Sequence, residues 1–369
     1  MKERSLFSAT QLKNETLNNR FVVAPMTRIS ADNNGQANET MKHYYERFAI
    51  GGFSAVISEG IYLDETYSQG YENQPGLANA AQAESWKPVV DAVKKHGTTF
   101  IAQLMHAGGQ SQGNAYESET IAPSSIAPKG EQLGFYGGSG PFQKPMEMSK
   151  QDIEKVKEAF VQSALHAKEA GFDGIELHGA NGYLLDQFLT DYLNQRTDEY
   201  GGSLENRIRL LLEVIEEVRT AVGEQYMVGI RISQGKVADA DHKWAGGEKD
   251  AEYLFSTLGK TSLDYIHVTD GDGTAPSFGN GTRTLAAAAK EFGGLPVIAN
   301  GKLGDPEKAE RTIRENEADY VSLATSALAN PDFPNKVSAG IERSAFDFEK
   351  ILLPKAEIKD HEINMKLVK

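Results

Sequence analysis

A histidine, an asparagine and a tyrosine follow an apolar stretch at closely spaced positions near the middle of the chain. His178 and Asn181 are hydrogen-bond donors three residues apart, and Tyr183 carries a phenolic proton two residues further on. Two donors can hold a carbonyl oxygen, and a positioned phenol can protonate the neighbouring carbon. These residue types and spacings indicate reduction of a carbonyl compound.

The composition narrows the chemistry further. A formal net charge of -14 at pH 7 argues against a nucleic-acid or anionic-membrane partner, because the long-range electrostatic term would be repulsive. The sequence contains no cysteine, which excludes disulfides, thiolate nucleophiles and cysteine-ligated iron–sulfur clusters. We expect no metal site, a small-molecule substrate, and redox chemistry carried by a bound organic cofactor.

The N-terminal segment MKERSLFSATQLKN has no apolar run of signal-peptide length. No run of about twenty apolar residues fit to span a bilayer occurs anywhere in the sequence. We therefore expect a soluble cytoplasmic protein, and an assembly of identical subunits is left open.

Short apolar runs alternate with longer amphipathic segments, a pattern typical of parallel strands joined by helices. The expected strands are Phe21–Met26, Phe53–Gly60, Thr99–His106, Gly174–His178, Met227–Ser233, Tyr265–Thr269, Pro296–Asn300 and Asp319–Ala324. The expected helices are Met41–Ala49, Ala83–Lys95, Gln151–Ala170, Glu205–Ala221, Asp250–Leu258, Arg283–Phe292 and Pro306–Glu315. Eight such units predict an α/β fold, a TIM (β/α)8 barrel, as one domain over residues 1–369 with a C-terminal tail at 343–369.

One segment does not fit the repeating pattern. Residues 107–148, after the third strand, are rich in Gly, Pro, Ser and aromatic residues and too long for an ordinary connection. Because barrel sites are built on the face at the C-terminal ends of the strands, we expect this insertion to form a hairpin or lid over the barrel mouth. A surface insertion without such a role is the alternative.

Polar and small residues stand at the C-terminal ends of several expected strands, where a barrel would bring them together. Gln103 and Arg231 interrupt apolar strands that have no structural need for them. The amide of Gln103 suits the pyrimidine edge of a flavin, and Arg231 can stabilise the negative charge of a reduced flavin ring. Thr27 can hydrogen-bond near the ring carbonyl. The candidate cofactor contacts are Pro25, Met26, Thr27, Gly60, Gln103, Arg231, Asn300, Gly301, Ala324 and Thr325.

The chain resembles the Old Yellow Enzyme family of FMN-dependent oxidoreductases. The resemblance runs from NRFVVAPMTR at residues 19–28 through IAQLMHAGG at 101–109 and HGANGYLLDQF at 178–188 to NPDF at 330–333. It implies that FMN is the cofactor, that NADH or NADPH supplies hydride, and that an α,β-unsaturated carbonyl compound is reduced. It further implies that His178 and Asn181 bind the substrate carbonyl and that Tyr183 is the proton donor.

The sequence departs from the family pattern at two points. Many relatives present a Gly-Arg pair that holds the FMN phosphate, and this chain has Ala324 and Thr325 there. We expect backbone amides of Asn300, Gly301, Ala324 and Thr325 to bind the phosphate instead, with Lys302 as a candidate cation. Met105 stands where some relatives carry tryptophan, which predicts a roomier substrate pocket.

Three other functions can be compared with this one, of which the first is the alternative that remains. A non-catalytic flavin-binding or sensing protein on the same barrel is suggested by the altered phosphate site. A dienoyl-CoA-reductase-like protein is excluded by chain length and by the lack of cysteine, and a barrel isomerase lacks a paired acid and base. Among the remaining charged residues, Glu176 is expected in a structural ion pair inside the barrel. A scaffold network is expected from Arg196, Asp198, Glu205 and Arg207.

Overall fold

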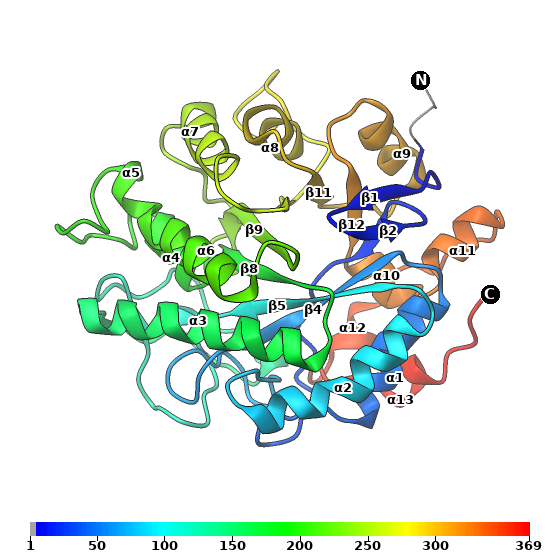
Figure 1. The fold of residues 1–369 in the computed structure, drawn as a ribbon, viewed down its shortest axis with the longest axis horizontal. Coiled ribbons are helices and arrows are strands. Elements are labelled where there is room, and N and C mark those ends of the chain that lie inside the picture. The colour runs from blue at the N-terminus through cyan, green and yellow to red at the C-terminus, as the bar shows by residue number, and fades with distance from the viewer. Residues whose placement is uncertain (1–4) are drawn as a thin grey trace.

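Eight short apolar segments form a closed barrel in the computed structural model, which describes residues 5–369 (Figure 1). All neighbouring strands of this barrel run parallel, in the order β10-β11-β12-β3-β4-β5-β8-β9. The strands are β3 (Phe21–Val23), β4 (Ala55–Tyr62), β5 (Thr99–Met105), β8 (Gly174–Asn181), β9 (Met227–Lys236), β10 (Tyr265–Thr269), β11 (Val297–Asn300) and β12 (Tyr320–Leu323). The predicted TIM barrel is confirmed.

Several strand ends differ from those expected, and the differences matter for the site. The first barrel strand ends at Val23 rather than Met26, and the proline at position 25, which has no N–H, follows it. By contrast, β8 continues to Asn181 because that residue still pairs with Lys236 beyond a break in register after Gly179. The expected limit at His178 was therefore too short, and Asn181 belongs to the strand itself.

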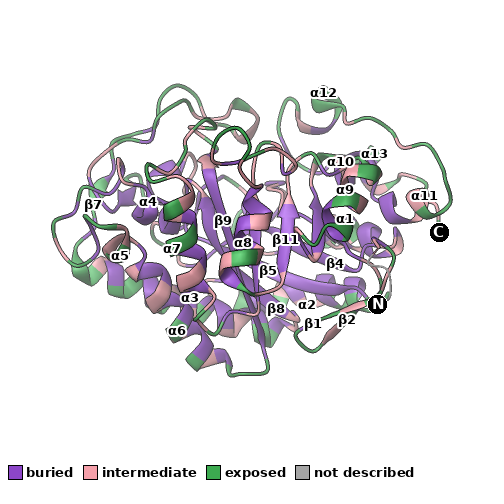
Figure 2. Ribbon diagram, turned by 90° about the horizontal axis from the view of Figure 1, so that it is seen from above, coloured by how far each residue is buried: buried purple, intermediate pink, exposed green. Residues whose placement is uncertain are grey.

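Helices surround the barrel, and the longer ones bury one face against it (Figure 2). They are α1 (Glu39–Ile50), α2 (Ala80–Lys94), α3 (Lys150–Ala170), α4 (Leu184–Leu189), α5 (Leu204–Arg207), α6 (Arg209–Val222), α7 (Glu248–Leu258), α8 (Leu285–Gly293), α9 (Pro306–Arg314), α10 (Thr325–Ala329), α11 (Phe333–Ser338), α12 (Phe348–Leu352) and α13 (Asp360–Ile363). The helix expected over Glu205–Ala221 is divided into α5 and α6.

Helix ends follow local sequence signals. Ser149 and Asp152 form a reciprocal capping box at the start of α3, and Asp305 accepts a hydrogen bond from the Glu307 amide at the start of α9. Gly171 ends α3 in the left-handed conformation. These local devices fix where each helix begins relative to the strand end before it.

A short antiparallel hairpin closes the N-terminal end of the barrel. Its strands are β1 (Thr10–Leu12) and β2 (Glu15–Leu17). Leu12 and Leu17 are fully buried in a cluster with the barrel residues Val22, Ala55, Ile57, Ile101, Met227, Tyr265, Ile298 and Tyr320. This hairpin was not expected from the sequence. It leaves the opposite end of the barrel as the place for a ligand.

The insertion at residues 107–148 contains little regular structure. Its two short strands, β6 (Ile121–Ala122) and β7 (Met146–Glu147), pair in parallel, and between them a single antiparallel bridge joins Glu131 to Pro141. Two single turns of 3-10 helix lie at Gly108–Gln110 and Gly134–Tyr136. The backbone N–H of Ala356, in the C-terminal tail, donates to Phe135 O at 2.8 Å. Insertion and tail therefore meet, although they are far apart in the sequence.

A buried ion pair anchors the C-terminal tail to the barrel. The Arg28 guanidinium lies 2.6 Å from Glu362 Oε1 and also donates to the backbone oxygens of Ala356 and Glu357. Arg47 contacts the same carboxylate at 3.3 Å. Burial alone would raise the pKa of Glu362, but Arg28 and Arg47 outweigh it and hold the pKa below its usual value.

Glu362→Gln should lower the free energy of unfolding by roughly 1–2 kcal/mol at pH 7, because charge-assisted hydrogen bonds become neutral ones. The pKa of Glu362 is lower in the folded state than in the unfolded state. Its stabilising contribution is therefore fully present above the unfolded-state pKa and is lost as the pH falls through the folded-state pKa. Urea denaturation at pH 7 measures the loss of stability in the variant, and urea denaturation at acidic pH shows whether the difference from the wild type disappears. Glu357→Gln is the matched control, since Glu357 is 55% exposed. An equal effect of the two substitutions would contradict the anchoring role.

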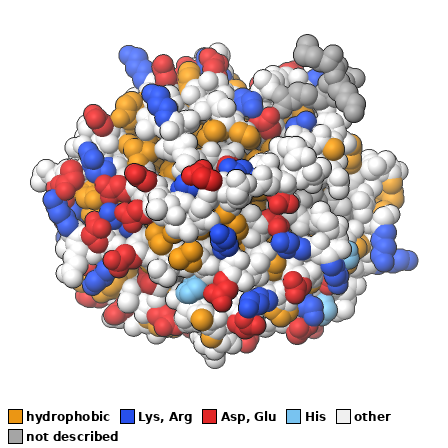
Figure 3. Space-filling model, viewed as in Figure 1, with side chains coloured by type: hydrophobic (Ala, Val, Ile, Leu, Met, Phe, Trp, Pro, Cys, Tyr) orange, Lys and Arg blue, Asp and Glu red, His pale blue; other side chains and the backbone are white. Residues whose placement is uncertain are grey.

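On the face in Figure 3, acidic and basic side chains are interspersed. Within residues 5–369, no helix is long and apolar enough to cross a membrane.

Candidate functional site

A cavity opens at the C-terminal ends of the barrel strands. It encloses about 870 Å³, including the space at its mouth, which lies in the usual range of ligand pockets. The lining residues come from strand ends, from the insertion and from the tail: Pro25, Met26, Thr27, Arg28, Gly60, Tyr71, Gln103, Met105, Leu133, Phe135, Tyr136, His178, Asn181, Tyr183, Arg231, Val237, Ala324, Thr325, Leu328, Phe346 and Leu352. Most of the candidate residues from the sequence therefore meet in one place.

His178, Asn181 and Tyr183 line the cavity together, from the end of β8. The rings of His178 and Tyr183 are 4.8 Å apart in an edge-to-face arrangement. Burial, and then the charge of Arg231, lowers the pKa of His178 well below its usual value, so the imidazole is neutral at pH 7. A neutral imidazole donates one hydrogen bond without adding charge.

Asn181 adopts an unusual backbone conformation, which its neighbours fix. Its φ is 62°, in the left-handed region that asparagine tolerates better than most residues. Its N–H donates to Ser233 Oγ at 2.8 Å, and its carbonyl oxygen accepts from Gln110 Nε2 and from the Val237 N–H. These contacts hold a strained residue in place at a candidate binding site.

A second tyrosine contacts the candidate proton donor. The hydroxyl oxygens of Tyr71 and Tyr183 are 2.5 Å apart, and both side chains are buried. Burial raises the pKa of Tyr183, whereas the hydrogen bond from Tyr71 lowers it. Burial, followed by the electrostatic influence of Tyr183, raises the pKa of Tyr71 well above its usual value. Both phenols are protonated at pH 7, and Tyr71 is placed to donate to Tyr183.

Gln103 and Gly60 form one wall of the cavity on the neighbouring strands β5 and β4, where they are paired in register. Gln103 Nε2 donates to the buried carboxylate of Glu176 at 2.9 Å. A Cβ atom on Gly60 would lie 2.6 Å from Met105 Sδ and 3.5 Å from Gln103 Oε1, so any side chain there would displace the wall. Glycine thus keeps this part of the cavity open to a flat ligand.

Arg231 lies on β9, separated from β5 by β8, and is almost fully buried. One terminal nitrogen donates to Asn300 Oδ1 at 3.2 Å, while Nε has no hydrogen-bond partner among the described residues. Burial lowers the pKa of Arg231, and the nearby Glu176 raises it; the guanidinium remains charged at neutral pH. An acceptor from outside the protein would satisfy this unused donor of a buried cation.

The structure separates the candidate phosphate-binding residues. Ala324 and Thr325 line the cavity at the start of α10, whereas Asn300 and Gly301 are not among its lining residues. The Asn300 side chain accepts a hydrogen bond from Arg231, which lines the cavity, and Gly301 packs against the loop at 270–273. The Lys302 side chain is largely exposed, with Nζ 3.9 Å from Asp272 Oδ2.

Some lining residues were not expected from the sequence. Tyr71 follows β4 in an irregular loop, and Leu133, Phe135 and Tyr136 belong to the insertion. The Tyr136 hydroxyl donates to the backbone oxygen of Thr27 at 3.2 Å. Tyrosines in loops carry no spacing signal, so nothing in the sequence assigned Tyr71 or Tyr136 to the site.

The scaffold assignments hold in part. Glu176 is fully buried and in hydrogen-bond contact with His267, so the expected interior partner of Glu176 is identified. Arg196 forms a 2.6 Å ion pair with Asp198, and the Arg207 guanidinium donates to the backbone oxygens of Leu189 and Gly202. These contacts fix the loop before α5.

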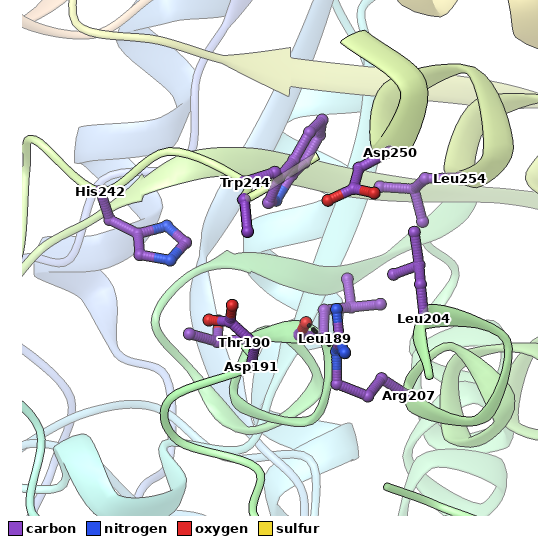
Figure 4. A pocket seen from close by; sticks show the side chains of 10 residues that line it. Leu189, Thr190, Asp191, Leu204, Arg207, His242, Trp244, Asp250 and Leu254 are labelled. Carbon is purple, nitrogen blue, oxygen red and sulfur yellow. Dashed lines mark hydrogen bonds between the residues drawn. The ribbon is translucent and has the colours of Figure 1, made fainter. Parts of the chain in front are cut away.

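A second, smaller hollow lies beside the barrel, between the loop after β9 and helices α4, α5 and α7 (Figure 4). Its polar groups already have protein partners: His242 Nδ1 is 2.9 Å from Gln234 O, Asp250 accepts from the Gly246 N–H, and Arg207 Nε donates to Leu189 O. None of the candidate site residues lines it. No group of three or more potential metal-ligating side chains occurs within residues 5–369.

Comparisons with known proteins give consistent matches over nearly the whole chain. A family model described as the NADH:flavin oxidoreductase / NADH oxidase family matches residues 5–344. A Leishmania infantum protein, described as a probable flavin mononucleotide-dependent alkene reductase, is 35% identical over 332 residues, which cover 88% of this chain and 87% of that protein.

Solved structures agree in fold and sequence. An old yellow enzyme homologue from Zymomonas mobilis is 28% identical with a TM-score of 0.89, covering 98% of this chain and 99% of that one. Morphinone reductase in complex with tetrahydroNAD is 30% identical with a TM-score of 0.86, covering 99% of this chain and 98% of that one.

Proposed function

The chain belongs to the NADH:flavin oxidoreductase / NADH oxidase family, and on that premise we propose that the cavity at the barrel mouth is its FMN and substrate site. The protein is an FMN-dependent oxidoreductase that takes hydride from NADH or NADPH. It reduces a carbon–carbon double bond, and we propose that this bond is conjugated to a carbonyl group.

One observation carries the assignment of the cavity. Arg231 and Gln103 line the same cavity from β9 and β5, the two strands on either side of β8, and Arg231 Nε is a buried donor that no other described residue satisfies. A buried donor without an acceptor costs about 1–3 kcal/mol, which a bound ligand can recover. The flavin ring offers acceptor oxygens and nitrogens along one edge and a flat body that Gly60 would admit. The residues present therefore fit FMN.

We propose that FMN is held by Pro25, Met26, Thr27, Gly60, Gln103, Arg231, Ala324 and Thr325 in direct contact, with Asn300 orienting Arg231. When bound, FMN supplies the hydride that it has received from the nicotinamide coenzyme. The chain's own groups bind the carbonyl compound and provide the proton.

His178 and Asn181 would hold the substrate carbonyl oxygen. Both lie at the end of β8, and the neutral imidazole of His178 can donate without requiring a counter-ion. Hydrogen bonds to this oxygen become stronger as negative charge develops on it, which favours the transition state over the bound substrate. The fixed backbone of Asn181 removes the need for reorganisation during the reaction.

Tyr183 would donate the proton to the carbon next to the carbonyl. Tyr71 supports it: by donating to the Tyr183 oxygen, its hydroxyl stabilises the phenolate that remains after proton transfer. The two buried phenols also restrict the access of water to this end of the cavity. Proton transfer from Tyr183 is then favoured over proton transfer from solvent.

Arg231→Leu should weaken FMN binding by about tenfold and make the flavin harder to reduce, because a buried cation is lost. Titration of the apoprotein with FMN and a spectroelectrochemical measurement of the reduction potential test both effects. Arg231→Lys is the control, since it retains charge but not the guanidinium geometry, and its potential should stay nearer that of the wild type. Unchanged FMN affinity and potential in Arg231→Leu would remove the residue from the proposed site.

Tyr71→Phe should slow the oxidative half-reaction three- to tenfold, since one neutral hydrogen bond to the departing phenolate is worth about 0.5–1.5 kcal/mol. Flavin reduction by the coenzyme should change much less. Stopped-flow absorbance of the reduced protein mixed with an enone gives the rate. An oxidative rate equal to that of the wild type would show that Tyr71 is only a packing residue.

The cofactor assignment itself has a simple test. The purified protein should show flavin absorption bands, and the chromophore released on denaturation should be FMN. A chromophore identified as riboflavin or FAD, or binding of FMN that Arg231→Leu and Gln103→Leu both leave unaffected, would contradict the proposed site.

A further inference from the structure

A buried carboxylate contacts the cavity wall without lining the cavity, and the proposed mechanism does not use it. Glu176 lies on β8, two residues before His178, and is fully buried. Its Oε1 accepts from Gln103 Nε2 at 2.9 Å, and its Oε2 lies 3.1 Å from the Tyr265 hydroxyl and 2.9 Å from His267 Nδ1. Three contacts from two other strands, β5 and β10, are more than a simple ion pair requires.

The charge state of this cluster follows from its contacts. Burial alone would raise the pKa of Glu176, but the hydrogen bond from His267, the charge of Arg231 and the hydrogen bond from Gln103 outweigh it and hold the pKa below its usual value. Burial lowers the pKa of His267, so its ring is neutral at pH 7. An ionised carboxylate only accepts hydrogen bonds, so His267 carries its proton on Nδ1 and accepts from Ser322 Oγ at Nε2, 2.8 Å away.

The ionised carboxylate also fixes the orientation of the Gln103 amide. Because Glu176 cannot donate, Gln103 must present its NH₂ group to it. The amide oxygen then faces the other way, toward Gly60 and the cavity, as its 3.5 Å separation from a Cβ built on Gly60 indicates. A ligand in the cavity therefore meets an acceptor from Gln103, which suits the ring N–H of a flavin.

The same carboxylate offsets the cation on the next strand. The register pairs Glu176 with Gly229 and His178 with Arg231, so the two charged residues lie two positions apart along adjacent strands. The charge of Arg231 favours ionised Glu176, and Glu176 favours charged Arg231. With His178 and His267 neutral, the two charges are the principal ones at this level of the barrel. Arg231 thus acts on a ligand as a partly compensated cation.

We propose that Glu176 is a positioning residue with two separable effects on the bound flavin. It locks the Gln103 amide with its oxygen toward the cavity, and its negative charge lowers the reduction potential that Arg231 alone would set. This inference rests on the proposed function, because it takes Gln103 and Arg231 as flavin contacts.

Three substitutions separate the effects in the FMN-loaded protein. Glu176→Gln removes the charge and leaves the amide free to turn, so the reduction potential should rise and FMN should bind at least several-fold more weakly. Glu176→Asp keeps the charge but withdraws it from Gln103, so FMN binding should weaken while the potential stays near that of the wild type. Tyr265→Phe removes one hydrogen bond to Glu176 but keeps its charge and its contact with Gln103. The reduction potential and the FMN affinity should therefore both be unchanged.

The readouts are the potential by spectroelectrochemistry and the FMN dissociation constant by fluorescence recovery on release. If Glu176→Gln does not fold, the comparison of Glu176→Asp with Tyr265→Phe still tests the amide orientation. A potential that is unchanged or lower in Glu176→Gln, or FMN affinity in Glu176→Asp equal to that in Tyr265→Phe, overturns the inference. If Arg231→Leu also leaves both quantities unchanged, the proposed flavin site is at fault rather than the role of Glu176.

Discussion

Tyr183→Phe should slow the oxidative half-reaction with simple enones about a hundredfold or more, as expected when a positioned general acid is lost. The reductive half-reaction should be nearly unaffected, because hydride transfer to the cofactor does not require the phenol. Tyr183 is buried at the cavity, beside His178 and within hydrogen-bond distance of Tyr71, so phenylalanine fits the same space. Stopped-flow measurements of the two half-reactions separate the steps.

The control for this substitution is Tyr62→Phe. Tyr62 is also a buried tyrosine that is hydrogen-bonded to a second tyrosine hydroxyl, Tyr116, but it does not line the cavity. Its loss should leave both half-reactions close to wild type. If Tyr183→Phe slowed both half-reactions equally, the proton-donor role would be wrong and the residue would instead shape the whole site.

The double change Ala324→Gly with Thr325→Arg should tighten FMN binding by about one to two decades, the value of a charge-assisted contact of about 1.5–3 kcal/mol. Ala324 and Thr325 line the cavity at the start of α10, where the Ala327 and Leu328 N–H groups already donate to Ala324 O. The exposed ammonium of Lys302 lies beside Asp272. We therefore expect the wild type to lose part of its FMN on dilution or gel filtration.

Isothermal titration of apoprotein with FMN and with riboflavin isolates the phosphate contribution. The double variant should gain affinity for FMN and not for riboflavin, which lacks the phosphate. Lys302→Ala is the companion variant, and it should weaken FMN binding only if Lys302 reaches the phosphate. An FMN dissociation constant unchanged or increased in the double variant would mean that other groups hold the phosphate.

Strand-end residues were predictable because the topology of a parallel barrel is simple. Once eight strands are recognised, their C-terminal ends must share one mouth, and Thr27, Gly60, Gln103, His178 and Arg231 do line one cavity. The polar types stand out because each interrupts an apolar run. Periodicity and residue chemistry were sufficient for this part of the site.

Other features depend on contacts between distant segments. The N-terminal hairpin has strands of three residues, too short for a periodic signal, yet Leu12 and Leu17 close the barrel. Tyr71 reaches Tyr183 from a loop, and Leu352 reaches the cavity from the tail. Gly301 stands at a strand end but turns toward the loop at 270–273, because its backbone packs there. Loop paths of this kind are set by tertiary packing rather than by local sequence.

We propose that the protein reduces enones bound in this cavity, and a measurement of anaerobic turnover tests this proposal most directly. FMN-loaded protein is mixed with NADH or NADPH and 2-cyclohexen-1-one, and both coenzyme oxidation and cyclohexanone are measured. We expect catalytic formation of cyclohexanone, one molecule per molecule of coenzyme oxidised. In Tyr183→Phe, turnover should fall about a hundredfold where the oxidative step limits the rate. Release of authentic FMN from a protein that forms no reduced product with any enone tried would contradict it and would favour a flavin-binding or sensing role.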